Sequence, residues 1–361
     1  MKKIDRRSFL KATALSFAAL GLAACGSTSG SSGAASASAD ASSAAGSAAG
    51  GKAYKVGIIN YMDHASLNQI VASVQAELDA LGSQYGCTFS YADYYDNAQA
   101  DASLLNQIAA NLVADGVDAI VAVATPAALA VQSYVADQGL DTPIIYSAVS
   151  DPESAGLTGL DNVTGTSDAL NTDAIISLIL AAKPEAKKIG LLYDLGQESS
   201  KSAIESAKAC CEENGLAYVE ANGTTTAEVQ LAAESLVAEG VDAVFTPTDN
   251  TIMSAELAIY ETFAEAGIPH FGGADSFALN GAFCGYGVDY VQLGTATADI
   301  VGRVLAGGEA PADIPYETFD NGIATVNTEI CAQLGLDMAG ITEAFAPYCT
   351  SVEEIVTAEA F

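Results

Sequence analysis

The stretch "LVADGVDAIVAVATPAAL", residues 112–129, recurs in nearly the same form as "LVAEGVDAVFTPTDNTIM" at residues 236–253. In both copies a helical pattern ends at Gly-Val-Asp, and a short apolar run follows. Glycine is typical of such a corner because it adopts the left-handed conformation that ends a helix. The apolar run is the pattern of a buried strand. The repeat therefore predicts two related helix-to-strand units in one chain.

The same succession of elements surrounds each copy of the repeat. The series begins with "YKVGIINY" at residues 54–61 and restarts with "KKIGLLYD" at residues 187–194. The other expected strands are residues 88–94, 117–125 and 142–148 in the first series, and residues 216–222, 241–248 and 268–274 in the second. Strands that alternate with helical patterns indicate parallel sheets covered by helices. The predicted fold class is α/β, with two doubly wound, Rossmann-like parallel-sheet lobes.

The two copies differ at the point where their strands end. Ligands of open α/β sheets bind beyond the carboxyl ends of the strands, so two such lobes in series are expected to enclose a cleft. Each strand leads into a helix N-terminus, whose free N–H groups suit an anion such as a carboxylate. Residues 125–126, Thr-Pro, would then form one wall of the site, and residues 248–250, Thr-Asp-Asn, the opposite wall.

The first 52 residues are expected to direct and tether the protein rather than to fold. Basic residues precede an apolar run, residues 12–22, that is too short to span a bilayer. The sequence "LAAC" before and at Cys25 resembles the bacterial lipobox, and a Gly/Ser/Ala-rich tether follows. We expect a signal peptide over residues 1–24, lipidation of Cys25, a flexible tether over residues 25–52 and an extracytoplasmic location at the cell membrane. Sec and twin-arginine export both fit this segment.

Composition and motifs argue against several classes of function. The chain carries 13 Lys and Arg against 45 Asp and Glu, a formal charge of -32 that repels nucleic acid. It has no G-x-S-x-G elbow and no phosphate-binding or dinucleotide-binding glycine motif. The six cysteines after Cys25 lack C-x-x-C spacing and a neighbouring histidine cluster, so a metal site is not expected, while disulfide pairing stays open. We expect a protein without catalytic residues, cofactor, metal or nucleic-acid partner.

Seven phrases between Tyr54 and about Leu336 resemble, in order, those of the solute-binding lipoproteins of ABC importers, in the branch associated with tryptophan and other aromatic amino acids. The phrases are "GIINYMDHASLNQI", "TPIIYSAVSDPESAGL", "NVTGTSD", "KIGLLYDLGQESS", "PTDNTIMSA", "FGGADSFALNGAFCGYGVDYVQLG" and "PADIPYETF". Their shared order, together with the lipobox, carries the resemblance.

The resemblance implies a two-lobed clamp, like the type I periplasmic binding proteins, that acts as a monomer. Lobe one would comprise residues 53–167 with about 289–319, and lobe two residues 168–288 with about 320–361. A hinge of crossing strands is expected near residues 166–168, 287–289 and 318–322, with the bound ligand favouring the closed state.

The resemblance also implies capture of a small ligand, an aromatic amino acid, and its delivery to an ABC permease driven by an ATPase. Two alternatives remain at this point. The same fold could bind another small solute such as a sugar, nucleoside or peptide, or it could be a ligand-sensing lipoprotein that acts through a separate receptor.

Candidate ligand contacts lie at or just after the expected strand ends. For an amino acid, Thr125, Ser147 and Ser150 with the helix N-termini would bind the carboxylate, and either Asp249 or Asp275 the ammonium. The remaining candidates are three tyrosines for the ring, Tyr61, Tyr193 and Tyr286, and the wall residues His64, Pro126, Thr248 and Asn250.

Each of these residues also has a structural interpretation. His64 and Asp249 could cap the helices that follow them. Ser147 and Ser150 could form the turn that a following Asp-Pro favours, and any one tyrosine could pack against the hinge.

Overall fold

The computed structural model describes residues 51–319 and 322–358, and residues Ala49–Phe361 form one compact unit. The expected signal peptide, Cys25 and all but the end of the tether lie outside the described residues. Within the described ranges, no helix is long and apolar enough to cross a membrane.

The first sheet, that of lobe one, has the strand order β12-β6-β5-β4-β1-β2, with β3 also paired to β1, and all of its pairings are parallel. Its strands are β1 (Ala53–Asn60), β2 (Thr88–Ser90), β3 (Tyr95–Asn97), β4 (Ala119–Val123), β5 (Ile144–Ser147), β6 (Val163–Ser167) and β12 (Glu317–Thr318). The expected strand at residues 88–94 is instead the short strand β2 followed by a 3-10 turn, η1 (Ala92–Tyr94), and β3 begins only at Tyr95. Polar and charged side chains interrupt the apolar pattern there, so no continuous strand forms.

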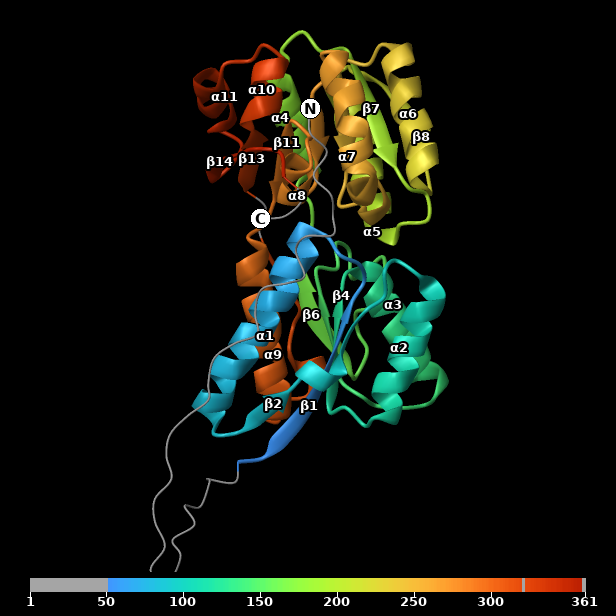
Figure 1. The fold of residues 1–361 in the computed structure, drawn as a ribbon, viewed down its shortest axis with the longest axis vertical. Helices are drawn as coiled ribbons and strands as arrows, with labels where there is room; N and C mark the ends of the chain where they lie inside the picture. The colour runs from blue at the N-terminus through green and yellow to red at the C-terminus, as the bar shows by residue number, and fades with distance from the viewer. Residues whose placement is uncertain (1–50, 320–321, 359–361) are drawn as a thin grey trace, which may run out of the picture. The chain divides into compact units, whose positions relative to one another are not determined.

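Four helices of the described residues cover this first sheet. They are α1 (Ala65–Tyr85), α2 (Ala102–Ala114), α3 (Thr125–Asp137) and α9 (Tyr290–Leu305), and a 3-10 turn, η2 (Pro311–Asp313), precedes β12. Helix α1 packs along α9 on one side of the sheet, and α2 packs on α3 on the other (Figure 1). Helix α9 comes from late in the sequence, so lobe one is built from two separate segments of the chain.

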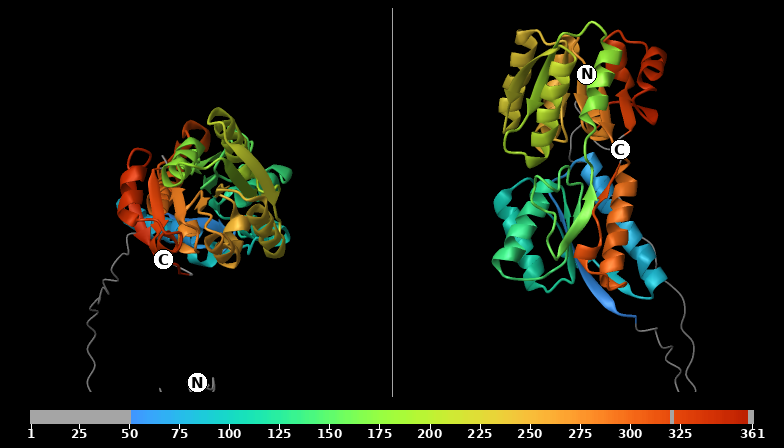
Figure 2. Two further views of the ribbon diagram at one scale, coloured as in Figure 1. Left: turned by 90° about the horizontal axis from the view of Figure 1, so that it is seen from above. Right: turned by 180° about the vertical axis from the view of Figure 1, so that it is seen from behind.

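The second sheet, that of lobe two, has the order β14-β13-β11-β10-β9-β7-β8, in which only the β11–β13 pairing is antiparallel among the described strands. Its strands are β7 (Lys188–Tyr193), β8 (Ala217–Asn222), β9 (Ala243–Thr246), β10 (His270–Gly272), β11 (Cys284–Gly287), β13 (Ile323–Asn327) and β14 (Ser351–Ile355). The C-terminal segment, red in Figure 2, forms one edge of this sheet. Two parallel-sheet lobes confirm the predicted fold class.

In the part of the chain that the structure describes, seven helices belong to lobe two. They are α4 (Thr172–Ala182), α5 (Glu198–Glu213), α6 (Thr226–Glu239), α7 (Asn250–Glu265), α8 (Asp275–Leu279), α10 (Thr328–Gln333) and α11 (Met338–Phe345). Helix α6 packs on α7, and α4 packs on both α5 and α11. The cysteines of the described residues are all free, which answers the question that their spacing left open.

The repeated phrase forms the same packing unit in each lobe. Gly116 and Gly240 have φ values of 64° and 67°, the left-handed conformation expected at the helix end. A side chain at Gly57, in the first strand, would place its Cβ 2.8 Å from Leu112, the first residue of the repeat. The small residue in the strand therefore lets the leucine of the helix lie directly on the sheet. Gly190 and Leu236 make the equivalent contact in lobe two.

The chain passes between the two sheets three times. It leaves lobe one after β6, returns after β11 into α9, and leaves again between β12 and β13. The passages begin after Ser167, after Gly287 and after Thr318. Because parallel strands end at the same edge of each sheet, the passages lie beside the residues that follow those ends.

Candidate ligand-binding site

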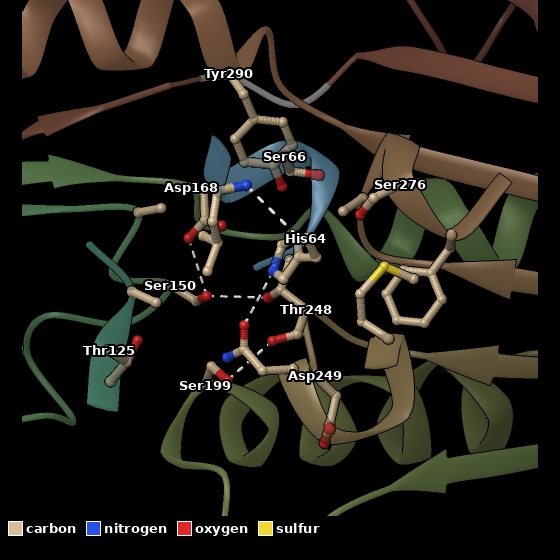
Figure 3. Close-up of a pocket in the computed structure, with 17 residues that line it drawn as sticks. His64, Ser66, Thr125, Ser150, Asp168, Ser199, Thr248, Asp249, Ser276 and Tyr290 are labelled. Atoms are coloured by element: carbon tan, nitrogen blue, oxygen red, sulfur yellow. Dashed lines mark hydrogen bonds between the residues drawn. The ribbon is translucent and has the colours of Figure 1, made fainter. Parts of the chain in front are cut away.

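A cavity lies where the strand ends of the two lobes face each other (Figure 3). In lobe one it is bounded by the first turn of α1 and by residues after β4, β5 and β6, and in lobe two by residues after β7, β9 and β10. The empty space that these residues bound, open solvent at the mouth included, is about 400 Å³. Half of the candidate contacts line it, namely His64, Thr125, Ser150, Thr248, Asp249 and Asn250.

The backbone of lobe one is strained where it reaches the cavity. Ala124, after β4, has φ 78°, and Ala148, after β5, has φ 55°. Alanine rarely adopts positive φ, and residues held in this way tend to gather at functional sites. Both alanines line the cavity, and Ala124 is the N-cap of α3, which no side chain caps. The sharp turn thus presents a helix N-terminus with free N–H groups to the cavity.

Thr125 occupies the first position of α3, and its hydroxyl is free. The Oγ1 atom is buried and has no hydrogen-bond partner among the described residues. Buried polar atoms in native proteins are nearly always paired, so an exception of this kind requires an explanation. The hydroxyl and the uncapped helix N-terminus together could bind a carboxylate.

Asp168, directly after β6, is the acidic residue that the candidate set missed. Its side chain is only 5% exposed and lines the cavity, and neither Lys nor Arg is among the described residues that surround it. Burial raises the pKa of Asp168 to about 6, although a hydrogen bond from Ser150 opposes the shift. A buried carboxylate without a cation in a ligand cavity could bind a positively charged group.

Ser150 connects Asp168 to the other lobe. Its Oγ donates to Oδ1 of Asp168 at 3.0 Å and lies 3.0 Å from Oγ1 of Thr248, which follows β9. An ionised carboxylate can only accept, so the single Ser150 proton goes to Asp168 and Thr248 donates to Ser150. The hydrogen bonds therefore run in one direction, from Thr248 through Ser150 to the carboxylate.

His64 is the N-cap of α1 and also contacts lobe two. Its Nδ1 accepts from the backbone N–H of Leu67 at 3.5 Å, and its Nε2 lies 3.3 Å from Oδ1 of Asn250. These contacts require a neutral ring that carries its proton on Nε2. The pKa of His64 is lowered to about 4 because the ring loses its solvation. The contact with Asn250 and the charge of Asp63 raise the pKa, but by less than the loss of solvation lowers it. The capping role and the cavity-lining role of His64 thus coexist.

Asp249 does not fit the ammonium role, although it lines the cavity. One carboxylate oxygen accepts from the backbone N–H of Asp194 at 2.8 Å and from Oγ of Ser200 at 2.7 Å. The other accepts from the N–H groups of Thr251 and Ile252, each at 3.0 Å. Four donors already satisfy both oxygens, so Asp249 acts as the cap of α7 and connects it to the start of α5.

This arrangement predicts that Asp249→Ala destabilises lobe two rather than only weakening ligand binding. Loss of the cap costs about 0.5–2 kcal/mol, and stranding buried donors costs about 1–3 kcal/mol more. Urea unfolding of the unliganded protein should show a loss of roughly 2–4 kcal/mol in the free energy of unfolding. An unchanged urea midpoint combined with lost affinity would instead return Asp249 to the ligand site.

Asp275 also does not fit the ammonium-binding role predicted for it. Its Oδ1 accepts from Oγ of Ser66, in α1, at 2.8 Å and from the N–H of Ser276 at 2.7 Å. Asp275 lines a neighbouring cavity with Tyr290 and Glu353 rather than the cavity of Figure 3. Burial raises its pKa to about 6. Asp275 therefore joins the two lobes and does not face the ligand space.

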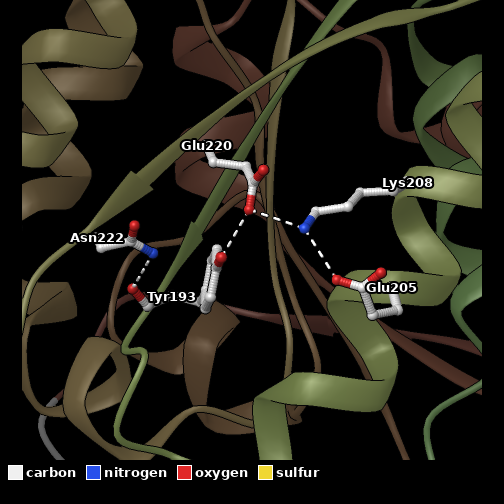
Figure 4. Close-up of polar contacts among 5 residues, drawn as sticks. All are labelled: Tyr193, Glu205, Lys208, Glu220 and Asn222. Atoms are coloured by element: carbon white, nitrogen blue, oxygen red, sulfur yellow. Dashed lines mark hydrogen bonds and ion pairs between the residues drawn. The ribbon is translucent and has the colours of Figure 1, made fainter.

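The three candidate tyrosines do not line the cavity. Tyr193 points its hydroxyl to Glu220 at 2.6 Å, and Lys208 holds that carboxylate at 3.0 Å (Figure 4). Tyr286 donates to the backbone oxygen of Tyr348 at 3.1 Å, and Tyr61 is buried, with its hydroxyl hydrogen-bonded to Gln197 of lobe two. The aromatic residues of the cavity are instead Phe277 and Tyr290.

Ser147 and Pro126 likewise lie outside the lining. The Ser147 hydroxyl is fully buried, 2.8 Å from Oγ1 of Thr297 in α9, where it holds that helix to the sheet. Pro126 is in the first turn of α3, where the missing N–H of proline costs nothing. Phe277 and Tyr290 lie in the first turns of the helices that follow β10 and β11, beyond the strand ends on which the sequence prediction rested.

Two further features of the cavity bear on its chemistry. Apolar side chains, Leu67 and Met253, share the lining with the two aromatic rings. Within the described ranges, no group of three or more His, Cys, Asp or Glu side chains could hold a metal ion. The site combines the buried carboxylate of Asp168, free hydroxyls, a helix N-terminus and an apolar wall.

The chain belongs to the family of ABC transporter substrate binding proteins, whose pattern matches residues 55–346. It is 32% identical over 313 residues to the tyrosine-binding protein of Clostridioides difficile (strain R20291), covering 85% of this chain and 88% of that one. It is thus a substrate-binding component that works with an ABC permease.

Solved structures agree with this assignment. The ABC domain from Streptococcus pneumonia in complex with L-Trp has a TM-score of 0.75 at 29% identity, covering 83% of this chain and 100% of that chain. The ligand-free, open structure of a substrate binding protein with adhesive properties from Clostridium difficile has a TM-score of 0.63 at 29% identity, covering 84% and 100%.

Proposed function

We propose that this chain is the extracytoplasmic, lipid-anchored binding component of an ABC importer and that it captures an amino acid with an aromatic side chain. One observation carries the proposal: the buried carboxylate of Asp168, without a cation, shares a cavity with the free hydroxyl and uncapped helix N-terminus at Thr125. An amino acid brings one ammonium and one carboxylate, which match these two groups. Relatives that bind tyrosine and L-Trp support the same ligand class.

The carboxylate of the ligand binds at the start of α3. The helix dipole and the free N–H groups favour an anion there, and Oγ1 of Thr125 gains the partner that it lacks. This assignment retains Thr125 from the sequence prediction and replaces Ser147, whose hydroxyl is engaged with Thr297.

The ammonium of the ligand binds Asp168. In the unliganded cavity burial disfavours the charged carboxylate, and a cation at hydrogen-bond distance removes that penalty. Ser150 keeps one carboxylate oxygen in place by donating to it, so the other oxygen is available to the ligand.

The ring of the ligand occupies the apolar part of the cavity. Phe277 and Tyr290 contribute aromatic rings to the lining, and Leu67 and Met253 contribute further apolar surface. Aromatic pairs add about 0.5–1.5 kcal/mol beyond burial, so a ring binds better here than an aliphatic side chain of similar size.

Anchoring and delivery complete the proposed role. Cys25 is the lipidated residue, and the tether after it lets the lobes reach a permease in the same membrane. The protein acts as a monomer that binds and releases its ligand unchanged. An ATPase on the cytoplasmic side drives transport.

A thermal-shift screen of residues 49–361 tests the ligand class. L-tyrosine, L-tryptophan and L-phenylalanine at about 100 times the dissociation constant should each add about 2.7 kcal/mol of stability. L-alanine, which has the same charged groups without a ring, serves as the matched control and should shift the melting temperature far less. A shift with sugars or nucleosides but with none of the amino acids would overturn the ligand assignment.

A further inference from the structure

A second free hydroxyl lies in the cavity, at Ser276 in α8. Its side chain is 0% exposed, and Oγ has no hydrogen-bond partner among the described residues. We infer that Ser276 selects the ligand by bonding a polar atom on its ring, so that the protein prefers rings bearing O–H or N–H over a plain phenyl ring. This inference rests on the proposed function and narrows its ligand class.

The position of Ser276 suits the ring of the ligand rather than its charged groups. Ser276 lies across the cavity from Thr125 and Asp168 (Figure 3). It precedes Phe277 in the chain, and Met253 belongs to the same lobe and the same lining. A ligand held by its ammonium and carboxylate in lobe one would extend its side chain toward this wall.

The other serines that line the cavity differ from Ser276 because their hydroxyls are already engaged. Ser66 donates to Asp275 at 2.8 Å, Ser199 donates to the backbone oxygen of Thr248 at 2.9 Å, and Ser150 donates to Asp168. Among the described serines that line the cavity, only Ser276 has a hydroxyl without a hydrogen-bond partner. Its free donor and acceptor capacity is therefore directed to the ligand rather than to the fold.

The chemistry sets the direction of selectivity. A phenol O–H or an indole N–H can donate to Oγ of Ser276, whereas a phenyl ring would leave that oxygen buried and unpaired. Leaving a buried polar group unsatisfied costs about 1–3 kcal/mol, and sites built to bond a substrate hydroxyl reject the analogue that lacks it. L-tyrosine or L-tryptophan should therefore bind roughly ten- to a hundredfold more tightly than L-phenylalanine.

Isothermal titration of the wild type and of Ser276→Ala with these three amino acids tests the inference. The variant should lose the preference, because its affinity for the polar ring falls, while its affinity for L-phenylalanine rises once no unpaired oxygen faces the phenyl ring. Ser199→Ala is the matched control: it removes a hydroxyl from the same cavity that is already bonded, so the ratio of affinities should stay as in the wild type. Melting curves of both variants without ligand show whether each is folded.

The outcomes separate this inference from the proposed function. If Ser276→Ala keeps the wild-type ratio, or if the wild type binds L-phenylalanine as tightly as both other amino acids, selection by Ser276 is overturned and the aromatic amino-acid assignment stands. If none of the three amino acids binds, selection by Ser276 and the aromatic amino-acid assignment are both wrong.

Discussion

Asp168→Asn should weaken the binding of L-tyrosine or L-tryptophan by a factor of roughly one hundred or more. The substitution keeps the size and the hydrogen-bonding shape of the side chain but leaves the ligand ammonium buried without a counter-charge. Removing one partner of a buried ion pair costs about 3–5 kcal/mol, and each 1.4 kcal/mol is about a tenfold change in affinity. Isothermal titration of the two proteins at pH 7.5 measures the loss.

A ligand without the amino group provides the control for this variant. For 3-(4-hydroxyphenyl)propionate, which lacks only the ammonium of tyrosine, the wild type and Asp168→Asn should bind with similar affinity. An equal loss for tyrosine and for this analogue would show that the substitution damages the cavity in general, and the ammonium would then need another partner.

The same variant should be more stable than the wild type when no ligand is present. The folded-state pKa of Asp168, about 6, lies above the usual value of 3.8, so the folded protein holds this proton more tightly than the unfolded chain does. Stability from this group is therefore present at low pH and is lost as the pH rises from about 4 to 6. Above pH 6, Asp168→Asn should gain about 2–3 kcal/mol in the free energy of unfolding.

Affinity for the amino acid should fall steeply as the pH drops below about 6. Asp168 must be ionised to bind an ammonium, and its pKa in the empty cavity is about 6. Closure also requires neutral His64, whose pKa is lowered to about 4 in this arrangement, against 6.5 for a solvated ring. Each group can contribute up to a tenfold loss per pH unit in its own range. Titrations at pH 5, 6, 7 and 8 measure the slope.

His64→Asn isolates the two contributions to this slope. Asparagine is a good N-cap and does not titrate, so α1 should keep its start while one of the two proton-linked steps disappears. The affinity of the His64→Asn variant for the amino acid should then change by at most tenfold per pH unit below pH 6. If the affinity of the wild type for the amino acid is constant between pH 5 and 7, the roles assigned to Asp168 and to His64 are both wrong.

The fold followed from local signals in the sequence. The Gly-Val-Asp corners, and the glycine in each first strand that faces Leu112 or Leu236, are set by turn geometry and close packing over short distances. The edge formed by β13 and β14 carried no such signal. It depends on pairing with β11, so no local pattern marks it in advance.

The site was only partly predictable, for a physical reason. Thr125, Ser150 and Thr248 follow strands, and parallel strands end at one edge, so the rule that brings them together is local. The side-chain directions of Tyr193 and Tyr286 depend on Glu220 and Tyr348, which are distant in sequence. Asp168 was hidden because it lies in a crossing segment, where an acid looks like part of a turn.

Several side-chain hydrogen bonds among the described residues join the lobes beside the cavity, including those from Ser66 to Asp275, between Ser150 and Thr248, and between His64 and Asn250. None of them includes the ligand, so closing is partly supported by the protein itself and the amino acid needs to supply less of the free energy. The consequence concerns unloading. A handover to the permease must break these bonds as well as the contacts to the cargo, at about 0.5–1.5 kcal/mol for each. The permease therefore has to separate the two lobes. Without the permease, the ligand-bound protein should release its ligand slowly.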